Sequence, residues 1–166
     1  MARKPFRGSV AANVLEQGTG AINIDGCRVE GNRFPPNVSL SGDAVDMLGD
    51  KARYFYCPKA SKTERNAGLD LPPKFTATMG SGIGEREHNE SEPGAWNPNH
   101  HPTCKPLALC RWLCRLVTPP AGRVVDPFMG SGSIGLAARQ EGFGFAGAEI
   151  SPDYYDIAEA RLSECL

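Results

Sequence analysis

Two acidic residues, one before and one well after a glycine-rich turn, mark the stretch of this sequence with the clearest chemistry. Asp126 follows two valines and precedes Gly130 and Gly132, and Glu149 ends a second short apolar run. Glycines let a backbone approach a ligand closely, and the first amides of a following helix point outward, unpaired and electropositive. An acid at the end of the next strand suits the two hydroxyls of a ribose. The pattern therefore predicts a ribose-bearing ligand at this turn.

The glycines are compatible with two kinds of ribose ligand. Gly130-x-Gly132-x-x-Gly135 matches the dinucleotide fingerprint, which has little specificity as a lone match. In that fingerprint the strand runs almost directly into the first glycine, whereas here the segment 126–129, Asp-Pro-Phe-Met, intervenes. A carboxylate at the strand tip repels a pyrophosphate but accepts hydrogen bonds from an ammonium, such as that of S-adenosylmethionine. S-adenosylmethionine is the preferred interpretation, ahead of a nicotinamide dinucleotide and of a turn that serves packing alone.

A strand, a tight loop, a helix and a second strand must position these residues. The apolar runs predict parallel strands over Val124 to Asp126 and over Phe145 to Ile150, joined by a helix that begins near Leu136. A last helix is expected over Tyr154 to Cys165, after Ser151-Pro152-Asp153. The predicted fold class is therefore α/β.

A further helix is predicted before the first strand, over Leu107 to Val117. Thr103 is suited to cap this helix, with Pro106 tolerated in its first turn. Arg111 and Arg115 share one face of the helix. The other face is apolar and is expected to pack on the sheet; it contains Leu109, Trp112, Leu113, Leu116 and Val117.

Several segments together resemble one enzyme family. The segment 101–106, His-Pro-Thr-Cys-Lys-Pro, then a helix, then 126–132, Asp-Pro-Phe-Met-Gly-Ser-Gly, and finally 147–150, Gly-Ala-Glu-Ile, are similar to the S-adenosylmethionine-binding half of DNA amino-methyltransferases. These enzymes methylate adenine N6 or cytosine N4, here in the permuted class whose cofactor half follows the catalytic half. The segments 2–5, 18–27 and 54–68 resemble phage and prophage members.

The resemblance implies a partial Rossmann-like, three-layer methyltransferase fold that lacks the strands of the catalytic half. It also implies S-adenosylmethionine as the cofactor. The residues that it assigns to the cofactor are Thr103, Lys105, Asp126, Pro127, Phe128, Gly130, Ser131, Gly132, Glu149 and Ile150. His101 is expected to be structural, because methyl transfer from a sulfonium needs no imidazole at this position.

The catalytic motif of the family is missing from this sequence. That motif is Asp, Asn or Ser followed by two prolines and an aromatic residue, which together hold a flipped base and its exocyclic amine. Three double prolines occur, and all differ from it: Phe34 precedes and Asn37 follows the first, while those at 72–73 and 119–120 lack the aromatic residue. We therefore assign no catalytic residue to this chain.

Three regions are expected along the chain. Residues 1–67 form a partial N-terminal region that packs on the sheet edge, and within them 52–57 are a candidate strand. Residues 68–100 form a flexible loop, a remnant of target recognition, and 101–166 form the cofactor-binding subdomain. The basic cluster of Lys59, Lys62 and Arg65 is the expected contact with DNA phosphates, with a solvated surface turn as the alternative.

Composition limits the remaining functions. The 166 residues carry a net charge of −1, so no strong overall field attracts nucleic acid. The six cysteines have no paired C-x-x-C, so free thiols in a reducing, cytoplasmic compartment are favoured over disulfides, and a zinc site near Cys110 and Cys114 is disfavoured. No apolar run is long enough to span a membrane.

Three functions are compatible with these features of the sequence. The first is the S-adenosylmethionine-binding part of a DNA amino-methyltransferase in a restriction-modification setting, truncated and needing a second chain with the catalytic motif. The second is a catalytically inactive phage protein that binds or inhibits a host protein. The third and weakest is a nicotinamide-binding module. DNA, a second copy of the chain or another chain are the expected partners, because an uncovered parallel sheet edge needs a cover.

Overall fold

The computed structural model describes residues 4–34, 47–51, 59–75 and 96–163. It contains a small parallel sheet of two strands, β3 (Arg123–Asp126) and β4 (Gly144–Gly147), and α4 (Ser133–Gln140) is the crossover between them. Val124 pairs with Phe145 and Asp126 with Gly147. The predicted parallel pair is therefore confirmed, although β4 ends at Gly147 and not at Ile150.

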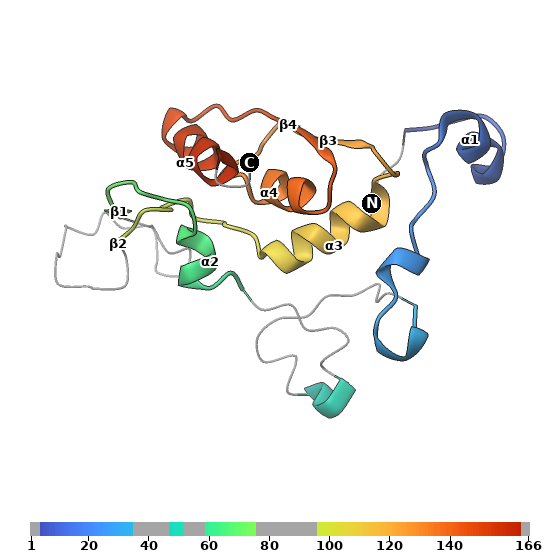
Figure 1. Ribbon diagram of the computed structural model, residues 1–166, viewed down its shortest axis with the longest axis horizontal. Helices are drawn as coiled ribbons and strands as arrows, with labels where there is room; N and C mark the ends of the chain where they lie inside the picture. The colour runs from blue at the N-terminus through green and yellow to red at the C-terminus, as the bar shows by residue number, and fades with distance from the viewer. Residues whose placement is uncertain (1–3, 35–46, 52–58, 76–95, 164–166) are drawn as a thin grey trace.

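Two further helices complete this part of the molecule. Helix α3 (Leu107–Val117) has the predicted bounds, and α5 (Pro152–Ser163) begins slightly earlier than predicted. Helices α3, α4 and α5 lie close to the two strands in Figure 1. The result is a mixed helix and strand fold with a small parallel sheet, as the α/β prediction required.

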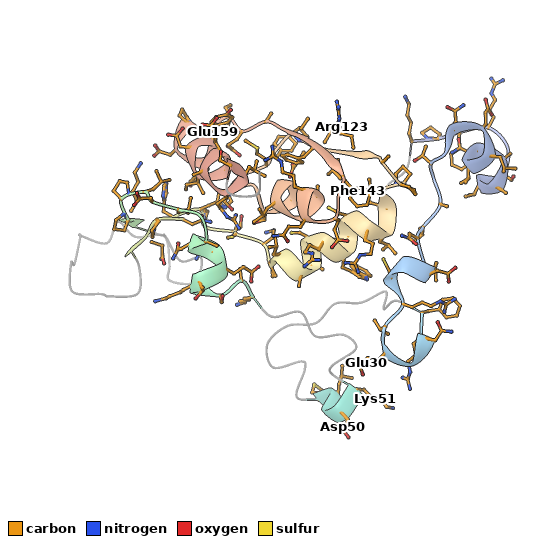
Figure 2. All side chains as sticks on the ribbon, viewed as in Figure 1. Glu30, Asp50, Lys51, Arg123, Phe143 and Glu159 are labelled. Atoms are coloured by element: carbon orange, nitrogen blue, oxygen red, sulfur yellow. The ribbon has the colours of Figure 1, made fainter. Side chains whose placement is uncertain are left out.

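The core lies between α3 and α4 and depends on small side chains. Cys110 and Cys114 of α3 meet Ala137 and Ala138 of α4, and all four are at most 4% exposed. Phe143, just before β4, packs against this cluster from the sheet side (Figure 2). Thiols and methyl groups are small enough to let two helices approach closely, and larger apolar residues such as Phe143 pack around them.

The predicted apolar face of α3 is only partly correct: Leu116 is 8% exposed, as expected. Leu113 and Val117 are 38% and 44% exposed, while the stripe that contains Cys110 and Cys114 is buried. A hydrophobic pattern gives a free thiol less weight than a leucine, although cysteine is among the most buried residue types. The partner helix α4 is rich in alanine and glycine, and this decided which face of α3 was covered.

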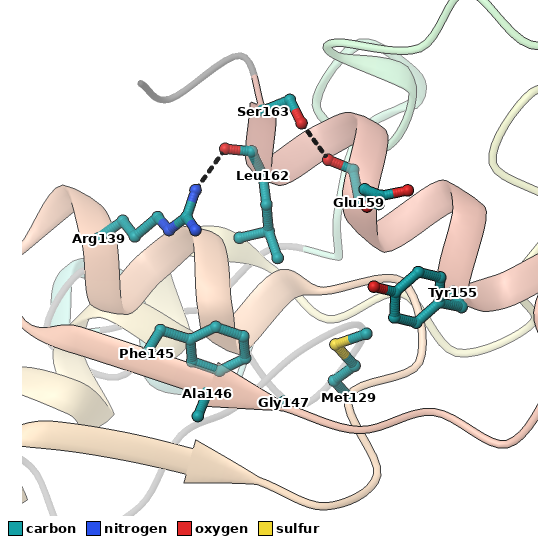
Figure 3. A pocket seen from close by; sticks show the side chains of 9 residues that line it. All are labelled: Met129, Arg139, Phe145, Ala146, Gly147, Tyr155, Glu159, Leu162 and Ser163. Atoms are coloured by element: carbon teal, nitrogen blue, oxygen red, sulfur yellow. Dashed lines mark hydrogen bonds between the residues drawn. The ribbon is translucent and has the colours of Figure 1, made fainter.

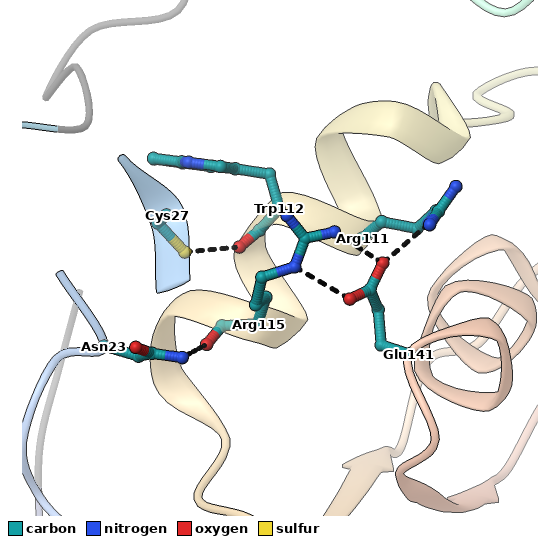
Figure 4. Close-up of polar contacts among 6 residues, drawn as sticks. All are labelled: Asn23, Cys27, Arg111, Trp112, Arg115 and Glu141. Atoms are coloured by element: carbon teal, nitrogen blue, oxygen red, sulfur yellow. Dashed lines mark hydrogen bonds and ion pairs between the residues drawn. The ribbon is translucent and has the colours of Figure 1, made fainter. Parts of the chain in front are cut away.

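Glu141, directly after α4, joins α4 to the arginines of α3. Its carboxylate accepts hydrogen bonds from Arg111 Nε (2.7 Å) and from Arg115 Nε and Nη2 (both 2.8 Å). These bonds, which Figure 4 shows, lower the pKa of Glu141 to about 2, and the bonds from Arg115 contribute most. The two arginines do share one face of α3, as predicted.

The N-terminal segment packs on α3. It contains α1 (Val10–Gln17) and two short 3₁₀ turns, η1 (Asp25–Cys27) and η2 (Glu30–Asn32). Asn23 donates from its backbone N–H to Leu116 O (2.8 Å) and from Nδ2 to Arg115 O (3.2 Å), as Figure 4 shows for the side chain. The covering of the sheet edge by residues 1–67 stays a prediction.

The middle of the chain contributes one short helix and a short antiparallel pair. Helix α2 (Lys62–Asn66) precedes β1 (Lys74–Phe75), which pairs with β2 (Trp96–Asn97). The candidate strand at 52–57 and most of the expected loop lie outside the described residues. None of the helices in the described part of the chain has the length and apolar character needed to cross a membrane.

Candidate functional site

The loop between β3 and α4 is tied to the end of β4. Ala148 N–H donates to Asp126 O (3.0 Å), and Met129 N–H donates to Ala148 O (3.0 Å), which extends the parallel ladder past both strands. Gly130 and Gly132 have φ of 51° and 75°, the left-handed conformation that favours glycine. The loop therefore turns sharply while it stays beside the carboxyl end of β4.

Both predicted carboxylates bind backbone amides near this loop. Asp126 Oδ1 accepts from Phe128 N–H (3.0 Å), and Glu149 Oε2 accepts from Gly130 N–H (2.9 Å). Glu149 Oε1 accepts from Ser151 N–H (3.0 Å). The two acids, separate in sequence, thus border one loop at the carboxyl edge of the sheet.

The pKa of Glu149 is lowered by these contacts. The Ser151 N–H contributes most, partial burial opposes it, and the Gly130 N–H adds to the lowering. The carboxylate is therefore ionised at neutral pH and ready to accept further hydrogen bonds. The Gly130 N–H of the loop is already bonded to Glu149.

Three large apolar side chains are exposed next to the acids. Phe128 is 88% exposed, Ile150 98% and Val125 68%. Val125 and Phe128 lie within two residues of Asp126, and Ile150 follows Glu149. We call these three residues the apolar rim. Large exposed apolar groups next to polar ones are typical of a ligand or partner site, so the rim suits the flat base of a nucleoside.

The glycines and the serine of the loop are buried. A Cβ at Gly130 would lie 2.6 Å from His101 Nε2, and a Cβ at Gly132 would lie 3.1 Å from the Cβ of Ala158. Ser131 is only 3% exposed. These three residues therefore shape the loop from within, while Pro127 and Phe128 form its exposed side.

His101 is packed between the loop and α5. Its ring lies edge-on to the ring of Tyr154, with 4.6 Å between centroids, and its Nδ1 accepts from Thr103 N–H (3.3 Å). Burial lowers the pKa of His101, and the charge of Glu149 opposes that change. The imidazole is therefore neutral at neutral pH, with its proton on Nε2, the atom next to Gly130.

The predicted cap of α3 is wrong. Pro106 occupies the N-cap position without a side-chain hydrogen bond, and Leu107 N–H donates to the carboxylate of Glu64 on α2. Thr103 and Lys105 are both exposed. The sequence analysis did not identify Glu64 as this partner. Ser61-x-x-Glu64 is nevertheless a capping pattern that signals the start of α2. Ser61 does cap α2, because its Oγ accepts a hydrogen bond from Glu64 N–H (3.1 Å).

Asn99 connects α2 to the segment that carries His101. It is fully buried; its Nδ2 donates to Arg65 O (2.8 Å), and its Oδ1 accepts from His101 N–H (3.2 Å). Its backbone N–H donates to Asn66 Oδ1 (3.1 Å). No local sequence pattern identifies such a residue, because its partners are distant in the chain.

The three basic residues predicted to contact DNA are not equivalent in the structure. Lys59 and Lys62 are exposed. The guanidinium of Arg65 instead points inward and donates to the carbonyl of His101. Of these three residues, the two lysines are therefore the ones whose side chains are exposed to solvent.

The cysteines form no metal site that the described residues reveal. Cys27, Cys104, Cys110 and Cys114 are free thiols. Burial raises the pKa of Cys27 and Cys114, which keeps both thiols protonated. No group of three or more His, Cys, Asp or Glu side chains within the described ranges is placed to hold a metal ion.

A hollow of about 280 Å³ lies between β4, α4 and α5 (Figure 3). Met129, Phe145 and Gly147 line one side, and Tyr155 and Leu162 of α5 line another. Arg139 donates to Leu162 O (2.6 Å) within it. Neither Asp126 nor Glu149 lines this hollow, so it is separate from the site that the two acids border.

Known proteins with related sequences are DNA methyltransferases. A family model described as DNA methylase (N6_N4_Mtase) matches residues 51–160. The chain is 30% identical to the type II methyltransferase M.Cfr9I of Citrobacter freundii, covering 79% of this chain and 41% of that protein. It is 37% identical to the type II methyltransferase M.XycI of Xanthomonas campestris pv. cyanopsidis, with the same coverage.

Solved structures are similar to parts of this chain. The M1.HpyAVI–SAM complex is 43% identical over 37% of this chain and 32% of that chain, with a TM-score of 0.36. The cytosine-N4-specific PvuII DNA methyltransferase is 34% identical over 37% of this chain and 22% of that chain, with a TM-score of 0.35. The chain spans about two fifths of the length of the two curated relatives above. Because the family model covers more than half of this sequence, the chain belongs to the N6/N4 DNA methylase family.

Proposed function

We propose that this chain is the S-adenosylmethionine-binding part of a DNA amino-methyltransferase. The observation that carries the proposal is the pair of carboxylates, Asp126 and Glu149, bound to amides two residues apart in one loop and bordered by the exposed apolar rim. Two acids and an apolar surface at the carboxyl ends of adjacent parallel strands match the polar and flat parts of an adenosine ligand. The SAM complex of M1.HpyAVI, similar over part of this chain, supports the choice of ligand.

Each group of the ligand has a suitable partner. Glu149 accepts from the two ribose hydroxyls, and the adenine packs on Ile150 and Phe128. Asp126 would accept from the ammonium of the amino-acid tail, and the bound cofactor would supply the methyl group. Methyl transfer to an exocyclic amine then depends mainly on positioning.

The groups that hold the target base come from residues outside this sequence. No Asp, Asn or Ser is followed here by two prolines and an aromatic residue. We propose that a second chain or another part of the enzyme supplies this motif beside β3, and that Lys59 and Lys62 contact DNA phosphates. The missing motif equally favours a second function, in which the chain binds the cofactor or a partner without catalysis.

Titration calorimetry with S-adenosylmethionine tests the cofactor site. Binding by the wild-type chain is expected, and Glu149→Gln should weaken it by about 10- to 100-fold, because each charge-assisted hydrogen bond to a carboxylate contributes about 1.5–3 kcal/mol. Asp126→Asn should weaken it by a similar factor. Asp156→Asn, an exposed acid on α5, is the matched control and should change nothing. Tighter binding of a nicotinamide dinucleotide than of S-adenosylmethionine would contradict the proposal.

A further inference from the structure

Arg161 of α5 is a buried guanidinium without a carboxylate partner among the described residues. It is 2% exposed, and its Nη1 donates to Ser131 O (2.6 Å), Ser131 Oγ (3.3 Å) and Ser133 Oγ (3.2 Å). Its Nε is buried and has no hydrogen-bond partner. Charges this deeply buried are normally paired, because desolvation is costly. The burial of this positive charge beneath the loop therefore needs a functional or structural explanation.

The buried charge lies beneath the start of α4. This eight-residue helix begins at Ser133, and its N-cap, Gly132, offers no side chain to the free amides. The amino end of a helix carries a partial positive charge and attracts anions. Through Ser131 and Ser133, Arg161 adds a full charge to the same place.

The segment that contains Thr103 and Lys105 crosses at this point. Cys104 Sγ lies 3.5 Å from Ser133 Oγ and 3.9 Å from Arg161 Nη1. The neighbouring side chains of Thr103 and Lys105 are exposed. A helix terminus and a buried guanidinium thus lie at one location, and both favour an anion. Thr103 and Lys105 flank Cys104 in the sequence, so their side chains are candidates to approach the same anion.

We infer that Arg161 is a positioning residue for the carboxylate of the methyl donor's amino-acid tail. This inference rests on the proposed function. Arg161 does not touch the carboxylate, because Ser131, Ser133 and Cys104 lie between them. It acts through its bonds to Ser131, which hold the loop in shape, and through its charge, which is only weakly screened inside the protein. The ammonium of the same tail is left to face Asp126.

An analogue of S-adenosylmethionine without its carboxylate tests the inference by calorimetry. Wild-type chain should bind S-adenosylmethionine about tenfold more tightly than the decarboxylated analogue. Arg161→Met should remove most of that preference by weakening S-adenosylmethionine alone, whereas Arg161→Lys, which keeps the charge, should retain part of it. Arg139→Met is the matched control, because Arg139 also bonds a carbonyl between α4 and α5, near the far end of α4.

Three results separate the possible failures. Equal weakening of both ligands by Arg161→Met would show that Arg161 only holds the fold, and would overturn the inference. Failure of the wild-type chain to bind either ligand would overturn the proposed function itself. If Arg161→Met does not fold, the Arg161 Nε–H resonance of ¹⁵N-labelled wild-type chain decides: it should move with S-adenosylmethionine and much less with the analogue, and equal movement contradicts the inference.

Discussion

Gly130 is required in the loop for two independent reasons. Its φ of 51° is unfavourable for any residue with a Cβ, and that Cβ would lie 2.6 Å from His101 Nε2. Its N–H also binds Glu149. Glu149 therefore holds the backbone of Gly130 on one side, and His101 leaves no room for a side chain on the other.

Gly130→Ala should destabilise the protein more than a glycine substitution that is strained only in its backbone. Gly142→Ala is the matched control, because Gly142 has φ of 80° with no atom within 4 Å of an added Cβ. We expect Gly142→Ala to lower the free energy of unfolding by about 1–2 kcal/mol, and Gly130→Ala to lower it further because His101 must move. Urea unfolding measures both. Equal losses would mean that His101 is not packed against Gly130 in solution.

Among the secondary-structure elements, polar side chains connect the helices in addition to apolar packing. Glu141 joins α4 to α3, and Glu64 of α2 binds the first amide of α3. Asn99 then connects α2 to the segment that carries His101. Short elements that bury little apolar surface are positioned through these bonds.

Glu141→Gln should lower the free energy of unfolding by about 1 kcal/mol at neutral pH, because Arg111 and Arg115 are 45% and 38% exposed and solvent screens the pairs. The folded-state pKa of Glu141, about 2, lies below its unfolded value. Its stabilisation is therefore complete above the ordinary glutamate pKa and is lost as the pH falls toward 2. Unfolding measured from pH 7 to 2 should show wild type and variant converge. Exposed Glu159→Gln, the control, should show no such convergence.

Glu64→Ala should loosen the first turn of α3. The loss of the acceptor for Leu107 N–H is expected to cost about 1 kcal/mol, as for other caps. Hydrogen exchange of the Leu107 amide should become faster, while the amides near Val117 should be unaffected. Glu64→Gln retains an acceptor oxygen and should restore most of the protection; failure to do so would mean that the charge, and not the hydrogen bond, stabilises the helix start.

In the whole molecule, the described sheet is small and partly open. Val125 on β3 is 68% exposed, and the described sheet contains only β3 and β4. The face and edge that the apolar rim borders are therefore open to another segment or chain.

The purified chain should incorporate no methyl groups into DNA although it binds S-adenosylmethionine. The reason is that no residue set in this sequence matches the family's motif for holding the target base. Transfer of a radioactive methyl group from S-adenosylmethionine to DNA is the measurement, with an active DNA methyltransferase as the positive control. Clear incorporation by this chain alone would reveal a catalytic residue outside the expected motif.

The sequence by itself determined the strand, loop and helix around Asp126, the bounds of α3 and the α/β class. These depend on apolar runs, glycine and proline, which act over a few neighbouring residues. Asp126 and Glu149 were also identifiable, because a parallel pair of strands brings their carboxyl ends to one edge.

Only the tertiary structure decided which face of α3 is buried, which residue caps it and where Arg65 points. Each depends on a partner that lies far away in the sequence: Ala137 and Ala138 for Cys110 and Cys114, Glu64 for Leu107, and the carbonyl of His101 for Arg65. The unpaired charge of Arg161 beneath the loop has the same origin, since its serine partners belong to another element. Packing between elements selects such contacts, and local sequence patterns do not predict them.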